Sequence, residues 1–118
     1  MAQVIRFFPR QTILGSTTVY SEIYEVAPET VTVLAEYRLW SYSGAGAGAG
    51  ISAAIETTMN PTFGPDTSWS AVASTGVIAA GVTVIEGTQI MRFVRGKIVA
   101  PGATAALLHF EGVTKESS

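Results

Sequence analysis

Alternation with a period of two residues is the feature that most restricts how this 118-residue chain can fold. It is clearest in segment 31–40, where neighbouring side chains of an extended strand point to opposite faces. The odd-numbered face carries Val31, Val33, Ala35, Tyr37 and Leu39, and the even-numbered face carries Thr32, Glu36 and Arg38, with Leu34 and Trp40 as apolar exceptions. The segment is rich in Val, Thr, Tyr and Trp, which favour strands. It therefore predicts a strand with one face in a core.

Similar patterns recur along the chain. They predict strands over 3–8, 17–26, 30–42, 51–59, 69–74, 77–85, 88–99 and 104–112. Turn residues separate them at Ala27-Pro28-Glu29, Asn60-Pro61, Gly64-Pro65-Asp66, Glu86-Gly87 and Ala100-Pro101-Gly102. About eight short strands and no helix predict an all-β fold, a jelly-roll-like antiparallel β-sandwich. We expect one domain over residues 1–118, with a frayed tail at 114–118.

The chain carries little charge. Seven Lys and Arg residues and nine Asp and Glu residues make 14% of it, against about 25% in an ordinary domain. This balance argues against a nucleic-acid partner, because nothing could neutralise a run of phosphates. Residues 67–85 are uncharged, but six are Ser or Thr and two are Gly, so we expect buried strands and no membrane partner. Small polar residues must fill the surface, or partners must cover it.

No set of residues predicts catalysis. The chain has no cysteine and one histidine, which excludes disulfides, thiolate chemistry and multi-histidine metal sites. A triad of His109, Asp66 and a serine lacks the G-x-S-x-G turn, so we expect His109 to be a hydrogen-bonded histidine on a strand. The acidic residues are scattered along the chain as Glu22, Glu25, Glu29, Glu36, Glu56, Glu86 and Glu111. We expect no enzyme, no cofactor and no metal.

Six aromatic residues allow a competing interpretation, in which they form a platform for stacking sugars. They are Tyr20, Tyr24, Tyr37, Trp40, Tyr42 and Trp69. Such residues more often lie in a core or a subunit interface, where they bury large areas while keeping a polar group. We therefore expect core or interface positions for them.

Two segments are candidate contacts between subunits. The first ten residues combine apolar and basic side chains, and such a terminal arm can add as a strand to a neighbour; its alternative is the first strand of the domain's own sheet. The Gly-Ala repeat at 44–50 is either a hairpin loop or a segment that lets a neighbouring backbone approach closely. The candidate interface residues are Ile5, Phe7, Phe8, Arg10, Gly44, Ala45, Gly46, Ala47 and Gly48.

Two stretches carry a family resemblance. They are 51–60 followed by Trp69-Ser70-Ala71-Val72, and Met91-Arg92-Phe93-Val94-Arg95-Gly96-Lys97-Ile98 followed by 105–113. This order of strand, turn, Trp, strand and "R-F/Y-V-R" resembles small β proteins of tailed-bacteriophage heads, over about the C-terminal two-thirds of the chain. Those proteins act as capsid decoration, cement or minor structural proteins.

The resemblance implies a non-enzymatic protein of the virion. It implies a homo-oligomer, a trimer, on the capsid surface in contact with the major capsid protein, made in the host cytoplasm. A similar order occurs in galactose-binding-like (discoidin-type) jelly rolls, which have a Ser-x-Asp-Gly-x-x-Trp turn. This chain has Thr58-Met59-Asn60-Pro61 there and a longer path to Trp69. A carbohydrate-binding module and a tail or head-completion subunit remain the alternatives.

Overall fold

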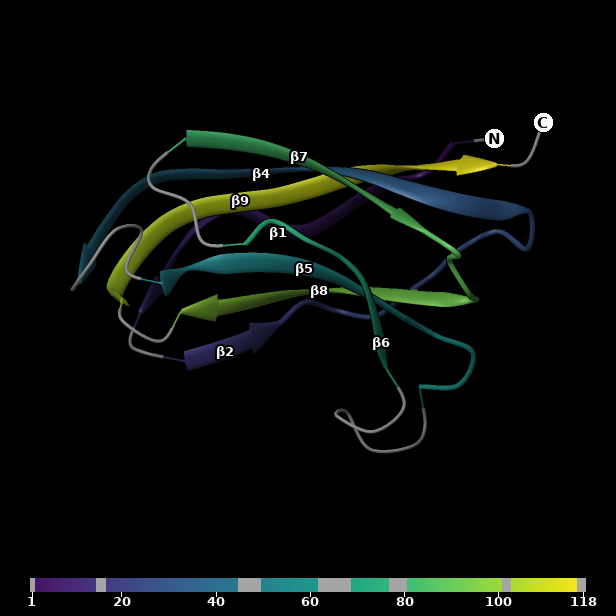
Figure 1. Cartoon of the computed structure of the whole chain (residues 1–118), viewed down its shortest axis with the longest axis horizontal. Helices are drawn as coiled ribbons and strands as arrows, with labels where there is room; N and C mark the ends of the chain where they lie inside the picture. Colours follow the sequence, from purple (N-terminus) through teal and green to yellow (C-terminus); the bar gives the residue numbers. More distant parts are fainter. Residues whose placement is uncertain are drawn as a thin grey trace.

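The computed structural model is a sandwich of two antiparallel sheets (Figure 1). It describes residues 2–14, 17–44, 50–61, 69–76, 81–100 and 103–116. One sheet has the order β1-β9-β4-β7, and the other has the order β2-β8-β5-β6, with β3 also pairing with β8. The strands are β1 (Val4–Leu14), β2 (Thr17–Tyr20), β3 (Tyr24–Glu25), β4 (Thr30–Gly44), β5 (Ser52–Thr58), β6 (Ser70–Ser74), β7 (Gly81–Thr88), β8 (Phe93–Ala100) and β9 (Ala103–Glu116).

The path of the chain is that of a jelly roll. If β2 and β3 are taken as one interrupted strand, eight strands remain, and the chain changes sheet at every connection except the one from β5 to β6. The first and last strands pair with each other, from Val4 opposite Val113 to Leu14 opposite Ala105. The predicted fold class is confirmed, and the described residues contain no α-helix.

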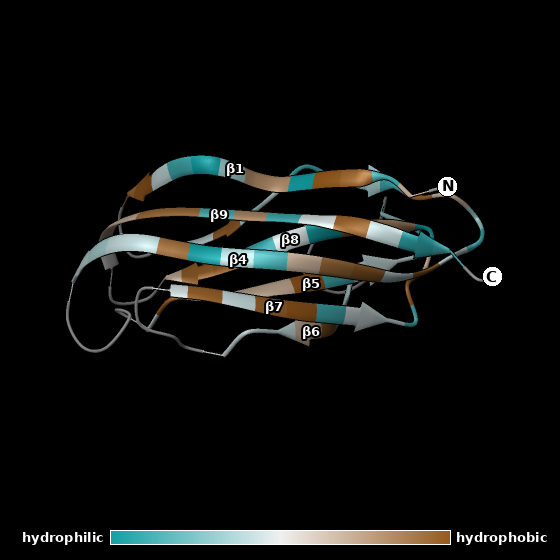
Figure 2. Cartoon of the chain, turned by 90° about the horizontal axis from the view of Figure 1, so that it is seen from above, coloured by the Kyte–Doolittle hydropathy of each residue, from teal (hydrophilic) through white to brown (hydrophobic). Residues whose placement is uncertain are grey.

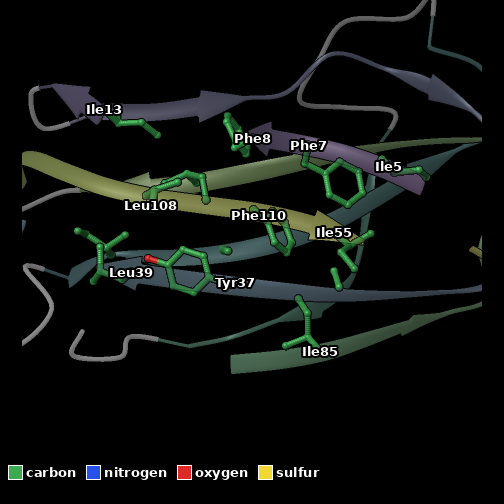
Figure 3. Close-up of a cluster of buried hydrophobic side chains, with 14 of the residues drawn as sticks. Ile5, Phe7, Phe8, Ile13, Tyr37, Leu39, Ile55, Ile85, Leu108 and Phe110 are labelled. Atoms are coloured by element: carbon green, nitrogen blue, oxygen red, sulfur yellow. The ribbon is translucent and has the colours of Figure 1, made fainter. Parts of the chain in front are cut away.

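The core lies between the two sheets and is apolar (Figure 3). Tyr37 and Leu39 of β4 reach it from one strand, and Leu108 and Phe110 of β9 reach it from the next. The Phe110 ring lies 5.1 Å from that of Phe7 and 6.3 Å from that of Tyr37, measured between ring centroids. The predicted odd-numbered face of 31–40 is buried from Val33 to Leu39. Val31 is exposed instead, because the pairing of β4 with β9 shifts register between Thr30 and Thr32.

The N-terminal segment is the first strand of the domain's own sheet. β1 continues to Leu14, past Pro9, through two irregularities in its pairing with β9. Ile5, Phe7 and Phe8 are each 2–3% exposed and belong to the core. This corrects the expectation of a docking arm, since these three side chains hold the two sheets of one chain together.

Other boundaries also differ from the prediction. The strand predicted over 17–26 is divided into β2 and β3, and the strand predicted from residue 88 begins at Phe93. Glu86 and Gly87 are not a turn, because they pair with Leu34 and Val33 inside β7, and the chain reverses after Thr88. The frayed tail is also wrong for its first three residues. β9 runs to Glu116, and Thr114 is buried, accepting a hydrogen bond from the Gln3 N–H at 2.8 Å through its hydroxyl.

Candidate interaction surface

The outward face of the four-stranded sheet gathers exposed apolar side chains. Cross-strand pairing places Val4, Val113 and Leu34 in one row across β1, β9 and β4. Val84 and Val82 lie beside Glu36 and Arg38 on the neighbouring strand β7. We call these five residues, Val4, Leu34, Val82, Val84 and Val113, the apolar strip; they are five of the nine exposed large hydrophobic residues of the described chain. A continuous exposed apolar area is typical of a surface that meets a partner.

A row of charges crosses the same face, and it is largely satisfied within the chain. Arg6, Glu111 and Glu36 lie on adjacent strands in one cross-strand row. The Arg6 Nε lies 3.4 Å from Glu111 Oε2, and His109 Nε2 lies 2.8 Å from Glu36 Oε1. His109 is therefore a hydrogen-bonded histidine on a strand, as predicted. Asp66, its suggested triad partner, lies outside the described residues.

Trp40 is the aromatic residue of this face. Its ring meets that of His109 edge-on, with 4.9 Å between centroids. The guanidinium groups of Arg10 and Arg38 lie 4.7 and 5.0 Å from the Trp40 ring. Cations at this distance are attracted to the face of an indole. Trp40 and the two arginines form a basic end of the face, next to the acidic row that contains Glu36.

A shallow depression of about 440 Å³ lies on this face. Val4, Leu34, Val84 and Val113 line it on the apolar side, together with side chains of the charged row. Ala35 and Gly112 lie at its base, and they pair with each other across β4 and β9. The depression follows from the sheet itself and is open. It suits contact with another surface better than enclosure of a small molecule.

The outward face of the other sheet is built around Arg95. This side chain is 5% exposed, and its Nε donates to Glu56 Oε1 at 2.8 Å. Its guanidinium carbon lies 3.9 Å from the centroid of the Tyr20 ring and 4.4 Å from that of Trp69. Lys97 adds a longer contact to Glu56, at 3.8 Å. Tyr20 and Trp69 thus stack on a cation of their own chain.

The other predicted platform residues lie elsewhere. Tyr37 is in the core, and Tyr24 and Tyr42 pack partly buried against it. Trp40 lies on the outward face of the opposite sheet from Trp69. The six aromatic residues do not assemble into one platform in the described chain. The expected core position is confirmed for Tyr37, and an interface position for the others stays a prediction.

A cavity of about 780 Å³ opens at one end of the sandwich. Its lining comes from the N-terminal segment, the turn before β4 and the turn before β8, with Val26, Pro28 and Ile90 among its apolar residues. Glu25 and Arg92 lie at its edge and pair at 2.7 Å. Sequence patterns do not reveal this cavity, because its lining residues come from separate segments.

The candidate interface residues predicted from the sequence lie in different environments in the structure. Ile5, Phe7 and Phe8 are core residues, and Arg10 is exposed on β1 beside Trp40. Gly44 ends β4, exposed and opposite Ala103, with a φ of 146° that favours glycine. Ala45, Gly46, Ala47 and Gly48 lie outside the described residues. The sequence analysis does not identify the apolar strip. Leu34 and Trp40, which are apolar residues on the polar face of the alternation, are the sequence signal that this face meets a partner.

Neither a metal-binding cluster nor a membrane-crossing helix is found among the described residues. No three His, Asp or Glu side chains in it gather closely enough to hold a metal ion. None of its segments forms a helix with the length and apolar character that crossing a membrane requires.

Comparison with known proteins shows similarity of fold only. No family model and no curated protein sequence matches the chain. Among solved structures, the PBSX exported protein XepA superposes with a TM-score of 0.70 at 12% identity, over 100% of this chain and 38% of that one. A chain of infectious bursal disease virus, Gx strain, gives 0.57 at 14% identity, over 98% of this chain and 32% of that one.

A third similar structure contains a carbohydrate-binding region. It is the Clostridium thermocellum endo-1,4-beta-D-xylanase 10B, its CBM22-1 and GH10 modules complexed with xylohexaose. The TM-score is 0.50 at 13% identity, over 84% of this chain and 19% of that one. This chain thus spans less than two fifths of the length of each of the three proteins. At such identities, the comparisons establish a β-sandwich shared with a viral protein, an exported protein and an enzyme's module.

Proposed function

We propose that this chain is a non-enzymatic structural protein of a virus particle, which decorates or cements the capsid of a tailed bacteriophage. It acts through contacts between its own copies and with the major capsid protein. The observation that carries the proposal is the outward face of the four-stranded sheet, where five aliphatic side chains are exposed around polar side chains that already contact one another. Covering such a face with another surface removes apolar area from water and is therefore favourable.

The comparisons support the virion part of this proposal through the fold alone. A viral structure and an exported protein both contain the same sandwich. The position on the capsid surface, the major capsid protein as partner and three-fold symmetry are implied by the family resemblance. Synthesis in the host cytoplasm belongs to the same proposal.

Particle binding tests the proposal directly. Purified chain is mixed with capsids of the source phage that lack it, the particles are pelleted, and the bound chain is located by electron microscopy. We expect saturable binding at positions that repeat with the capsid lattice. Density in a ring or tube on the tail would instead identify a tail or head-completion subunit. A chain that stays in solution beside intact capsids would overturn the proposal.

A carbohydrate-binding module is the second candidate, favoured by the similarity to the xylanase module alone. It requires sugars to reach Trp40 or Trp69, both of which lie against cations of the same chain. A glycan array combined with tryptophan fluorescence decides between the two. We expect no sugar to change the fluorescence, and saturable quenching by one oligosaccharide would favour the module.

A further inference from the structure

Strand β7 is an edge of the four-stranded sheet, and among the described strands only β4 pairs with it. Figure 2 shows it at one margin of the layer, beyond β4. All eight of its residues pair with β4, from Gly81 opposite Leu39 to Thr88 opposite Thr32, with no irregularity. It contains no proline, lysine or arginine, and Glu86 is its one charged residue. Regular edges with so little charge readily accept another strand.

The other edge strands are blunted. β1 contains Pro9, Arg6 and Arg10 and has two irregularities in its pairing. β2 has four residues and β3 has two. β6 has five residues and a shift in its register with β5. Proteins use short strands, bulges, proline and basic residues in this way to prevent pairing between edges. In the described chain, β7 alone lacks every one of these features.

The side chains of β7 also suit a partner strand. Val82 and Val84 are 51% and 60% exposed, on the outward face, whereas Ile85 faces the core. The neighbouring strand β6 approaches β7 at Gly87, where the Val72 side chain would lie 2.9 Å from an added Cβ. The half of β7 around Val82 and Val84 therefore combines exposed β-branched side chains with an edge that pairs on one side only.

We infer that β7 pairs with β7 of a second copy of this chain, antiparallel across a two-fold axis. A second copy of the chain is the partner that this arrangement favours. Because β7 is the one unblunted edge of the described chain, two copies that pair through β7 form a closed dimer and cannot extend into a fibre. Pairing must also keep the outward residues on one face, which excludes any shift by a single residue.

The charges of β7 permit this pairing. With Val84 opposite Val84 of the other copy, Val82 lies opposite Glu86, twice in the dimer, and no like charges meet. The two four-stranded sheets then become one sheet of eight strands. The valines of the two apolar strips lie side by side at its centre, where cross-strand pairs of β-branched residues stabilise a sheet.

This inference deepens the proposed function and rests on its claim of contacts between copies. It requires an even number of copies in the assembly, whereas the family resemblance implies three. The contact is also confined to the rim of one sheet. The rest of the apolar strip, with Val4 and Val113 on the far strands, stays open to a capsid.

The absence of cysteine from the chain makes cross-linking a clean test. Val84→Cys, treated with a mild oxidant, is expected to form a disulfide-linked dimer in most molecules. Leu34→Cys is the matched control, exposed on the same face but one strand further in. Edge pairing places the two copies of Leu34 three strand spacings apart across the sheet and offset along the strands, so at least about 14 Å separates them, too far for a disulfide. Dimers through Leu34→Cys and none through Val84→Cys would show stacked faces and overturn the inference.

A charge on the edge gives a second test. Light scattering after size exclusion should show a dimer for the wild-type chain and for Leu34→Lys, and half that mass for Val84→Lys, with all three equally folded by circular dichroism. A dimeric Val84→Lys would overturn the inference.

Capsid binding separates this inference from the proposed function. A wild-type dimer that ignores capsids leaves the edge pairing intact and overturns the proposed function. A wild-type monomer that binds capsids overturns the edge pairing and leaves the proposed function intact.

Discussion

Gly96 occupies a position in β8 where no side chain fits. A Cβ added there would lie 2.7 Å from the Phe7 Cβ and 3.2 Å from a ring carbon of Phe110. The glycine lets the Phe7 ring of one sheet lie directly against the backbone of the other. Through this contact between Gly96 and Phe7, β1 packs against β8 of the five-stranded sheet.

Gly96→Ala should therefore destabilise the protein by about 1–3 kcal/mol, the usual cost of overfilling a packed core. Urea unfolding followed by fluorescence measures this free energy. Gly76→Ala is the control, because its φ of +67° strains any side chain while nothing lies within 4 Å of the added Cβ. Gly96 is not among the glycines with a positive φ, so its loss reports the contact with Phe7, and a Gly96→Ala variant as stable as the wild type would contradict this account.

Tyr37 buries a hydroxyl group that has no hydrogen-bond partner in the described chain. Its ring contributes to the core, while its oxygen loses contact with water and gains nothing in return. Burial also raises the pKa of Tyr37 to about 12, because the phenolate would be desolvated. Tyr37→Phe should leave the free energy of unfolding at pH 7 unchanged or raise it by up to about 1 kcal/mol.

The raised pKa of Tyr37 gives a dependence on pH that the same variant removes. Below pH 10, both states keep the phenolic proton and Tyr37 contributes no pH dependence. Between pH 10 and about 12, the unfolded chain releases the proton and the folded chain retains it. The free energy of unfolding should fall over this range, by at most about 3 kcal/mol. Urea unfolding of both proteins from pH 9 to 12 measures the difference, and parallel curves would show that Tyr37 ionises freely in the folded state.

Among the elements, β8 is held to its neighbours by the ion pair of Arg95 with Glu56. Arg95 connects β8 to Glu56 of β5, Tyr20 of β2 and Trp69 before β6. Removing one partner of a buried pair leaves the other charge poorly compensated, at a cost of about 3–5 kcal/mol. We expect a loss in this range for Glu56→Ala, measured by thermal and urea unfolding.

Glu25→Ala is the matched control. Glu25 and Arg92 pair at 2.7 Å, but their side chains are more than half exposed, so the loss should stay below about 1 kcal/mol. The double variant Glu56→Leu and Arg95→Met should recover much of the stability that Glu56→Ala loses. Equal losses in Glu56→Ala and Glu25→Ala would show that burial adds nothing to the pair.

The elements could be predicted from the sequence where alternation and turn residues agreed. β4, β5 and β6 begin and end within two residues of their predictions, and the turns at Pro28 and Pro61 occur as predicted. Glu86-Gly87 was misread because glycine there serves close packing against Val72, and composition cannot distinguish this from a turn. Thr114 was misread because its burial depends on a bond to Gln3, at the opposite end of the chain.

The candidate surface was less predictable than the strands. The apolar strip is assembled from four strands, and its rows exist only once the register of β1, β9, β4 and β7 is known. Arg10 was identified, but for an arm that does not exist. Its contact with Trp40 requires β1 and β4 to lie on either side of β9, which no local pattern encodes.

In the whole molecule, a low content of charge coincides with an open edge. Charged residues make up 14% of the chain, with a formal net charge of −2. Apart from Glu86, the charged residues of the four-stranded sheet lie on β1, β9 and β4, one or more strands away from β7. An edge-to-edge dimer is therefore held by backbone hydrogen bonds and valine contacts, and a face-to-face dimer would place Glu36, Arg38 and His109 within the interface.

The effect of salt on the dissociation constant distinguishes an edge-to-edge dimer from a face-to-face dimer. Raising the salt from about 0.05 to 0.5 M shortens the screening length from roughly 14 to 4 Å, which weakens attraction between exposed charges. For edge pairing, we expect the dissociation constant from sedimentation equilibrium to change by less than about threefold over this range. A rise of tenfold or more would indicate that the charged face forms the contact.

Val82→Lys should make the dissociation constant of the dimer depend on salt. In the inferred register, each new lysine lies opposite Glu86 of the other copy, so two attractive pairs are gained. The dimer should then tighten at low salt and return toward the wild-type dissociation constant at high salt. Val4→Lys, on the opposite edge of the same face, should show neither effect. If Val82→Lys instead dissociates the dimer at every salt concentration, Val82 does not face Glu86, and the register around Val84 is wrong.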